Sequence, residues 1–208
     1  MNDFEEYIKQ QEPEKAEKSY VWLTAIGLQE VDGLKASPYL IETARQNIDG
    51  NITIDEVKQR IDSYYKIKPV GNENDRTEEA DKVSVRIAEI LSEKTFVFSP
   101  VEYITIHKRL FEEIYSFAGK IRDYNISKAE WVLNGKTIYY ASADSIHATI
   151  NYDFEKEKEF KYHRLSLLQF RSTYCKFYIR LMANSRIGRG KYTNNRSIYH
   201  KIFANIGL

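Results

Sequence analysis

Apolar residues recur at helical spacing along most of the chain, and short capping signals divide them into segments. The first segment ends where Gly33 can adopt the left-handed conformation that stops a helix. Its apolar residues are Tyr20, Trp22, Leu23, Ile26 and Leu28. Ser37 followed by Pro38 is an N-cap with a first-turn proline, so the pair predicts a second helix that runs toward Gly50.

Thr53 and Glu56 have the spacing of a capping box and predict the start of a third helix. Residues 1–70 are therefore expected to form a module of three helices. The polar stretch GNENDR, from Gly71 to Arg76, follows as a linker.

A second helical block is expected to begin near Thr77. Its buried face should hold Val83, Ile87, Ile90 and Leu91. Ser99 and Pro100 open the next helix, which is expected to end at Gly119. The residues expected to be buried along that helix are Ile104, Leu110, Ile114 and Phe117.

The pattern changes to that of strands in the stretch WVLNGKTIYY. Asn134 and Gly135 stand there between two β-prone runs, and such a pair is a strong hairpin signal because both turn positions need positive φ. A helix from about Ser142 to Glu157 follows. The expected fold class is therefore all-α, mainly helical, with one small β-hairpin.

Length and cysteine content fit an intracellular protein. The 208 residues can bury a core in one domain with a small helical extension. The single cysteine, Cys175, excludes a disulfide framework and a multi-cysteine zinc site. No apolar run has the length of a signal peptide or a transmembrane helix, so we expect a cytoplasmic location and no membrane partner.

Charge is distributed unevenly, because residues 161–208 hold ten Lys and Arg and no Asp or Glu. A basic tail suggests a nucleic-acid partner. The stretch LMANSRIGRGKYTNNRSIYH, however, lacks the spacing of a phosphate-binding loop, since Ser185 replaces the first glycine and Tyr192 follows Lys191. The stretch also lacks a stacking platform, so nucleic acid is not the expected partner.

Three segments resemble the first half of a Fic (Fido) domain. They are EADKVSVRIAEIL, VFSPVEYITIHKRLFEEIYSFAGKIRDYNISKAEWVLNGKTIYY and SADSIHATINYDFEKEK. The segment from Ser19 to Tyr65 resembles the small helical antitoxin-type module that accompanies some Fic proteins. The resemblance divides the chain into an antitoxin-like module at 1–70, the N-terminal part of a Fic domain at 71–169 and an aberrant basic tail at 170–208.

The resemblance implies a relation to protein adenylyltransferases, which transfer the adenylyl group of ATP to a hydroxyl of a target protein with Mg²⁺ (AMPylation). It also implies that the hairpin is a flap, on which the target protein lies as an added strand. The residues of this flap would be Asn125, Ile126, Trp131, Val132, Leu133, Thr137, Ile138 and Tyr139.

The catalytic loop of the family, His-x-Phe-x-x-Gly-Asn-x-Arg, is missing from this sequence. In the family the histidine accepts the target's proton, an acidic residue binds magnesium, and the helix N-terminus and arginine hold the phosphates. None of the histidines precedes such a loop; they are His107, His147, His163 and His200. We therefore expect this chain to be inactive, with no catalytic residue, no metal ligand and no cofactor.

The missing loop is recovered when the tail is read in a displaced frame. If each written codon joins the last base of one lost codon to the first two bases of the next, Met182 before Ala183 forces a tryptophan. The following codons permit Leu-Trp-Gln-Ile-His-Val-Leu-Gly-Glu-Gly-Asn-Thr-Arg, which resembles the family motif. The tail is therefore interpreted as truncated and frameshifted from about Gln169 or Phe170.

A regulatory function is the alternative, in which the N-terminal helices act as an antitoxin-like or binding module of a toxin–antitoxin pair. Related modules carry a Ser/Thr-x-x-x-Glu-Gly motif, and the nearest match is Leu28 to Gly33, with Asp32 in place of the glutamate. Asp32 and Gly33 also have a structural interpretation as a helix stop. A homo-oligomer stays open as a partner, and His107 is interpreted as a packing or surface residue.

Overall fold

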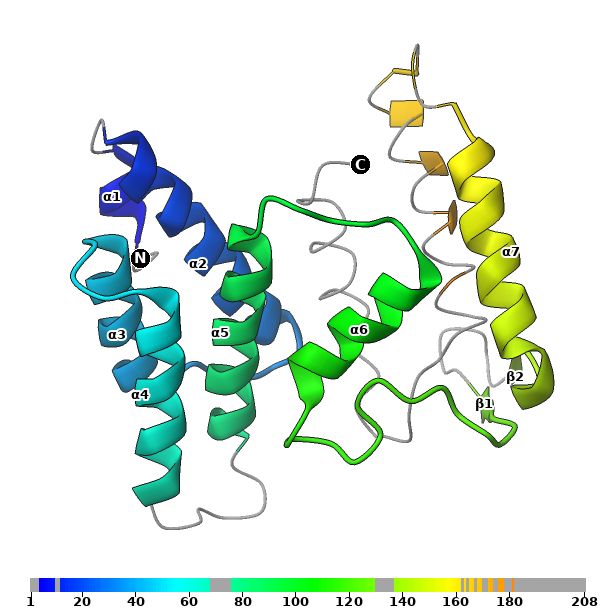
Figure 1. The fold of residues 1–208 in the computed structure, drawn as a ribbon, viewed down its shortest axis with the longest axis horizontal. Coiled ribbons are helices and arrows are strands. Elements are labelled where there is room, and N and C mark those ends of the chain that lie inside the picture. Colours follow the sequence, from blue (N-terminus) through cyan, green and yellow to red (C-terminus); the bar gives the residue numbers. More distant parts are fainter. Residues whose placement is uncertain are drawn as a thin grey trace. The chain divides into compact units, whose positions relative to one another are not determined.

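The computed structural model describes residues 4–9, 12–67, 76–129 and 137–161, together with 163, 165, 166, 168, 169, 172, 173, 176, 177 and 181. The chain divides after Phe96 into two compact units, which are described separately below. The described residues form seven α-helices and two strands of three residues each (Figure 1). The expected mainly helical class is therefore confirmed. In this described part, no helix is both long and apolar enough to cross a membrane.

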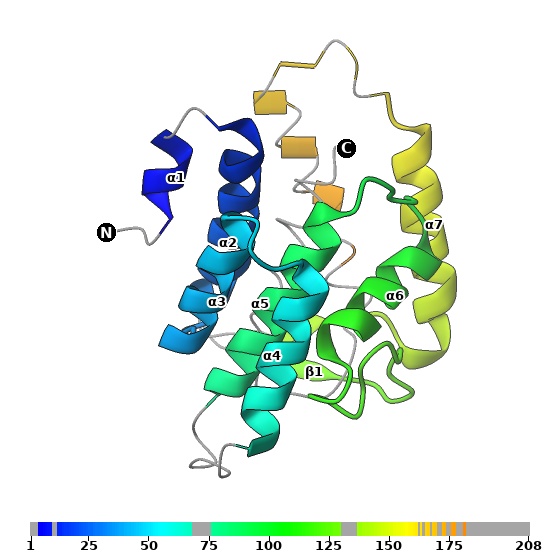
Figure 2. The same cartoon turned by 60° about the vertical axis from the view of Figure 1, so that its left-hand side comes forward.

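The first unit is a helical bundle. Its helices are α1 (Glu5–Lys9), α2 (Pro13–Val31), α3 (Pro38–Ile48), α4 (Ile54–Ile67) and α5 (Thr77–Ser92). Helix α2 packs against α1, α3 and α5, and α4 packs against α3 and α5, as Figure 2 shows for the group α2 to α5. The three helices predicted within residues 1–70 correspond to α2, α3 and α4, and the structure adds the short helix α1. Helix α5, beyond the linker, is buried on most of its surface and completes this bundle.

Local side-chain and backbone bonds set the ends of these helices where the sequence predicts them. The Ser37 hydroxyl accepts a hydrogen bond from the Leu40 N–H at 3.0 Å and caps α3. Thr53 and Glu56 form the capping box, with the Thr53 N–H donating to the Glu56 carboxylate at 2.7 Å. Gly33, with φ of 74°, follows Asp32, the C-cap of α2, and turns the chain out of the helix.

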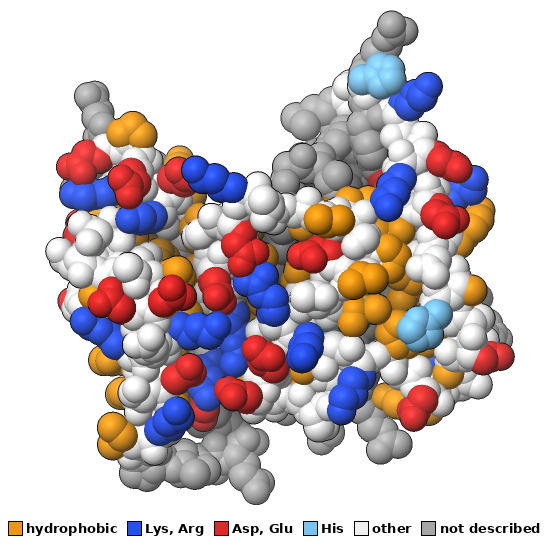
Figure 3. All heavy atoms as spheres, in the orientation of Figure 1, with side chains coloured by type: hydrophobic (Ala, Val, Ile, Leu, Met, Phe, Trp, Pro, Cys, Tyr) orange, Lys and Arg blue, Asp and Glu red, His pale blue; other side chains and the backbone are white. Residues whose placement is uncertain are grey.

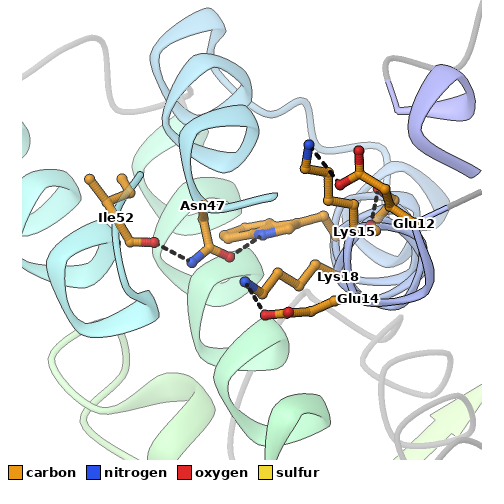
Figure 4. Close-up of polar contacts among 8 residues, drawn as sticks. Glu12, Glu14, Lys15, Lys18, Asn47 and Ile52 are labelled. Atoms are coloured by element: carbon orange, nitrogen blue, oxygen red, sulfur yellow. Dashed lines mark hydrogen bonds and ion pairs between the residues drawn. The ribbon is translucent and has the colours of Figure 1, made fainter. Parts of the chain in front are cut away.

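Buried polar groups connect the helices of the first unit. The Trp22 indole N–H donates to the Asn47 side-chain oxygen at 3.0 Å, and the Asn47 amide donates to the Ile52 carbonyl at 2.9 Å (Figure 4). Asp81 of α5 accepts hydrogen bonds from the Ser37 N–H at 2.8 Å and from the Tyr65 hydroxyl at 2.7 Å. These bonds satisfy groups that would otherwise be costly to bury, and they fix α3, α4 and α5 relative to one another.

The second unit is built from two helices and a small sheet. It contains α6 (Pro100–Phe111), β1 (Ser127–Ala129), β2 (Thr137–Tyr139), the short 3₁₀ helix η2 (Ala143–Ser145) and α7 (Ile146–Glu159). Helices α6 and α7 contact each other. Strands β1 and β2 are antiparallel, with Ser127 opposite Tyr139 and Ala129 opposite Thr137. Asn134 and Gly135, predicted to form the turn, lie outside the described residues.

Helix α6 is shorter than the sequence predicts. It begins at the expected cap, where the Ser99 hydroxyl accepts from the Glu102 N–H at 3.1 Å, but it ends at Phe111 rather than at Gly119. Glu113 has a φ of 65°, which breaks the helix, and turns follow up to Gly119. As a result Ile114 and Phe117, expected to be buried, are half-buried.

An aromatic cluster forms much of the core of the second unit. Phe98 and Phe154 have ring centroids 4.7 Å apart, and Phe177 lies 5.7 Å from each of them. Phe177 is 2% exposed, and Leu181 is also buried. Two side chains of the region assigned to an aberrant tail therefore pack in the core.

Candidate functional site

The residues of the expected flap fall partly within the described structure. Asn125 is exposed and Ile126 is half-buried just before β1, and Thr137, Ile138 and Tyr139 form β2. Trp131, Val132 and Leu133 lie outside the described residues. The described part of the flap is therefore its base and its two paired strands.

Arg122 holds the two sides of this base together. Its guanidinium donates to the Tyr124 carbonyl at 2.6 Å and also to the Ala141 carbonyl. Tyr124 precedes β1 and Ala141 follows β2, so one side chain bridges the two ends of the hairpin. Arg122 is 4% exposed, and hydrogen bonds to a buried charged donor are among the stronger ones in proteins.

A second contact closes the base on the solvent side. The Asn125 side-chain oxygen accepts from the Ala143 N–H at 2.8 Å, and this contact is exposed. Ala143 is the first residue of η2, which leads into α7. The hairpin is thus joined to the start of α7 as well as to the segment before β1.

His107 fixes the loop that leads from α6 toward the flap. Its Nδ1 accepts from the Gly119 N–H at 2.8 Å, and its side chain is 1% exposed. Burial lowers the pKa of His107 from 6.5 to about 4, so the imidazole is neutral at pH 7, as this acceptor role requires. Gly119 has a φ of 69°, and a Cβ there would lie 2.6 Å from the Lys108 Cβ. The structure therefore confirms His107 as a packing residue.

Asp32 and Gly33 form a helix stop. The Gly33 N–H donates to the Glu30 carbonyl and the Leu34 N–H donates to the Gln29 carbonyl, both at 2.9 Å, in the pattern of a Schellman motif. Burial raises the pKa of the Asp32 carboxyl to about 6, although the nearby Arg76 guanidinium acts in the opposite direction. The backbone of Asp32 and Gly33 therefore ends α2, and an inhibitory role of the Asp32 carboxylate stays a prediction.

A separate groove of about 520 Å³ lies on the surface of α3 and α4. Its lining consists of Tyr39, Glu56, Gln59, Arg60, Ser63, Tyr64 and Ile67. Tyr39 and Tyr64 stack with their ring centroids 4.4 Å apart, and Ile67 is largely exposed. The periodic pattern predicts α4 but gives no sign of this groove, because Tyr39 comes from a different helix.

The described residues include no group of three or more His, Cys, Asp or Glu that could hold a metal ion. On the face shown in Figure 3, Lys and Arg side chains are interspersed with Asp and Glu, and hydrophobic side chains are exposed over α6 and α7. Exposed residues of this second unit include Val97, Val101 and Tyr152. The basic stretch from residue 182 onward lies outside the described residues.

The chain was compared with models of protein families, with curated proteins and with solved structures, and no match was found. The sequence did not predict the two hydrogen bonds by which Arg122 joins the Tyr124 and Ala141 carbonyls at the base of the hairpin, which we call the clasp. Arg122 belongs to the run Gly119-Lys120-Ile121-Arg122, but nothing in that run indicates that its partner is the carbonyl of Ala141.

Proposed function

We propose that this chain descends from Fic-family protein adenylyltransferases and is inactive because its catalytic loop is missing. The observation that supports the proposal is the small hairpin between α6 and α7, whose base is joined by Arg122. The hairpin lies where the resemblance to the family places the flap. The related enzymes transfer AMP from ATP to a protein hydroxyl. In this chain only the part that would receive the target protein is retained.

The hairpin suits an acceptor segment for physical reasons. In the described part of the chain the sheet has two strands, so each strand has an outer edge. An extended peptide can add to such an edge through main-chain hydrogen bonds, which require no particular peptide sequence. Phosphoryl-type transfer depends mainly on positioning and on charge stabilisation, and the loop that performs both in the family is missing from this sequence.

Calorimetry with ATP and Mg²⁺ tests the inactive state. We expect no saturable, magnesium-dependent binding by the chain as it stands. Specific binding would mean that the basic stretch from 182 onward holds a phosphate site after all.

Restoring the displaced frame near the codons for Gln169 and Phe170 tests the ancestry. The restored protein should label itself or a partner with the adenylyl group of ATP in the presence of Mg²⁺. Replacing the restored histidine by alanine should slow the transfer by roughly 100-fold or more, the scale expected for loss of a general base. A restored protein that folds but neither labels protein nor releases pyrophosphate would contradict the proposal.

A second candidate is a binding or regulatory function of the N-terminal helices. It is favoured by the compact first unit and by its groove beside Tyr39 and Tyr64. The test is to add the present chain in excess to the restored enzyme. Inhibition that is lost with Tyr64→Ala but retained with the exposed control Tyr20→Ala would favour this second function.

A further inference from the structure

Three side-chain hydrogen bonds join the two ends of the hairpin and the start of α7 at the base of the hairpin. In the described part of the chain the sheet has two strands, and a two-stranded hairpin on its own is marginally stable in water. Ser127 and Tyr139 form the strand pair nearest the base of the hairpin. Beyond this pair, away from the turn, Arg122 bonds to the Ala141 carbonyl and Asn125 accepts from the Ala143 N–H. These side chains therefore add hydrogen bonds that join the two ends of the hairpin at its base.

The chemistry of arginine suits this closure. A guanidinium is planar and presents several N–H donors in a fixed fork, so it can hold two carbonyl oxygens at a set distance from each other. Here the two acceptors are Tyr124 and Ala141, seventeen residues apart around the hairpin. A lysine ammonium is a compact point charge on a flexible stem and cannot impose the same separation.

Burial makes the clasp stronger than the neighbouring contact. Arg122 is almost entirely removed from solvent, so a broken bond would leave its guanidinium charge poorly solvated. The bond between Asn125 and Ala143 is exposed, and water can replace it at little cost. Opening of the hairpin should therefore be governed by Arg122 rather than by Asn125.

We infer that Arg122 is the positioning residue of the hairpin, which holds the two strands in register before any partner strand arrives. A preformed edge avoids the entropy loss of ordering a loop upon binding. The consequence for a docked target strand rests on the proposed function, whereas the clasp itself rests on geometry alone.

Hydrogen–deuterium exchange of the full chain tests the clasp. The variants are Arg122→Met, which removes both bonds, Arg122→Lys, which preserves charge, and Asn125→Ala. Ile150→Val and Ile150→Ala are matched controls, because Ile150 is buried on α7 in the same unit and its truncation lowers stability without touching the hairpin.

We expect the amides of 127–129 and 137–139 to exchange at least roughly 10-fold faster in Arg122→Met, relative to the amides of α6 in the same variant. Arg122→Lys should restore only part of the protection, and Asn125→Ala should change it little. In the Ile150 controls the hairpin and α6 should accelerate together. Equal acceleration of hairpin and α6 in Arg122→Met would overturn the inference, as would full protection in Arg122→Lys.

The frame-restored protein provides the functional readout. Arg122→Met should slow transfer to the protein acceptor by about 10-fold or more and leave the dissociation constant for ATP unchanged, because the clasp acts on the acceptor side. Weaker ATP binding in step with slower transfer would refute the positioning role. If the unaltered restored protein labels nothing, the proposed function fails, and the exchange experiment still decides whether the clasp exists.

Discussion

The buried imidazole of His107 should make the stability of the second unit depend on pH. Burial lowers the pKa of His107 from 6.5 to about 4 in the folded chain, so the unfolded chain takes up a proton at a higher pH than the folded chain does. The contribution of His107 is therefore fully present above about pH 6.5 and is lost as the pH falls toward 4. Between pH 7 and pH 5 this linkage amounts to about 2 kcal/mol.

The perturbation is His107→Asn. The asparagine side-chain oxygen can take the place of Nδ1 and accept the Gly119 N–H, but it does not titrate. Loss of the ring should lower the free energy of unfolding at both pH values by about 1–3 kcal/mol. The difference between pH 7 and pH 5, however, should shrink by about 2 kcal/mol relative to the unaltered chain.

Urea unfolding at pH 7 and pH 5 measures this difference, and NMR titration of the imidazole signals checks its cause. The His107 signal should show no protonation between pH 8 and about pH 5. His147→Asn is the matched control, because His147 is an exposed residue of α7 and its replacement leaves the buried site intact. If His107→Asn keeps the pH dependence of the unaltered chain, the buried neutral histidine is not its source.

Two further substitutions test close contacts in the second unit. Gly119→Ala should destabilise the chain by about 2–4 kcal/mol, because its φ is positive and the added Cβ would meet the Lys108 Cβ, whereas Gly27→Ala in the open helical position of α2 should be neutral or stabilise by up to about 1 kcal/mol. Thermal unfolding of the two variants checks this, and shifts of equal size and sign would contradict the argument. Phe177→Ala should lower the free energy of unfolding by about 3–5 kcal/mol, since Phe177 packs edge-on against Phe154. An unchanged urea midpoint would show that this part of the tail does not belong to the core.

The features that the sequence alone determined are helix ends, which depend on local interactions. Ser37, the pair Thr53 and Glu56, and Ser99 cap helices as their spacing predicts, and Gly33 stops α2. Each of these interactions joins groups a few residues apart, so its geometry follows from the helix itself. The hairpin was also predicted from a local signal, a turn pair between two β-prone runs. A two-residue turn at that pair would place Val132 opposite Thr137, whereas the strand partner of Thr137 is Ala129.

The tertiary structure decided the features that join distant segments. The end of α6 depends on a positive φ at Glu113 and on the bond between His107 and Gly119, which no periodic pattern encodes. The sequence pattern also did not predict that α5 packs in the first unit or that Arg122 bonds to the Ala141 carbonyl. A buried histidine or arginine is stabilised by acceptors and donors that approach only after the chain has collapsed. The sequence therefore shows which polar residues are present, and desolvation by the assembled fold decides which of them must be paired and with what.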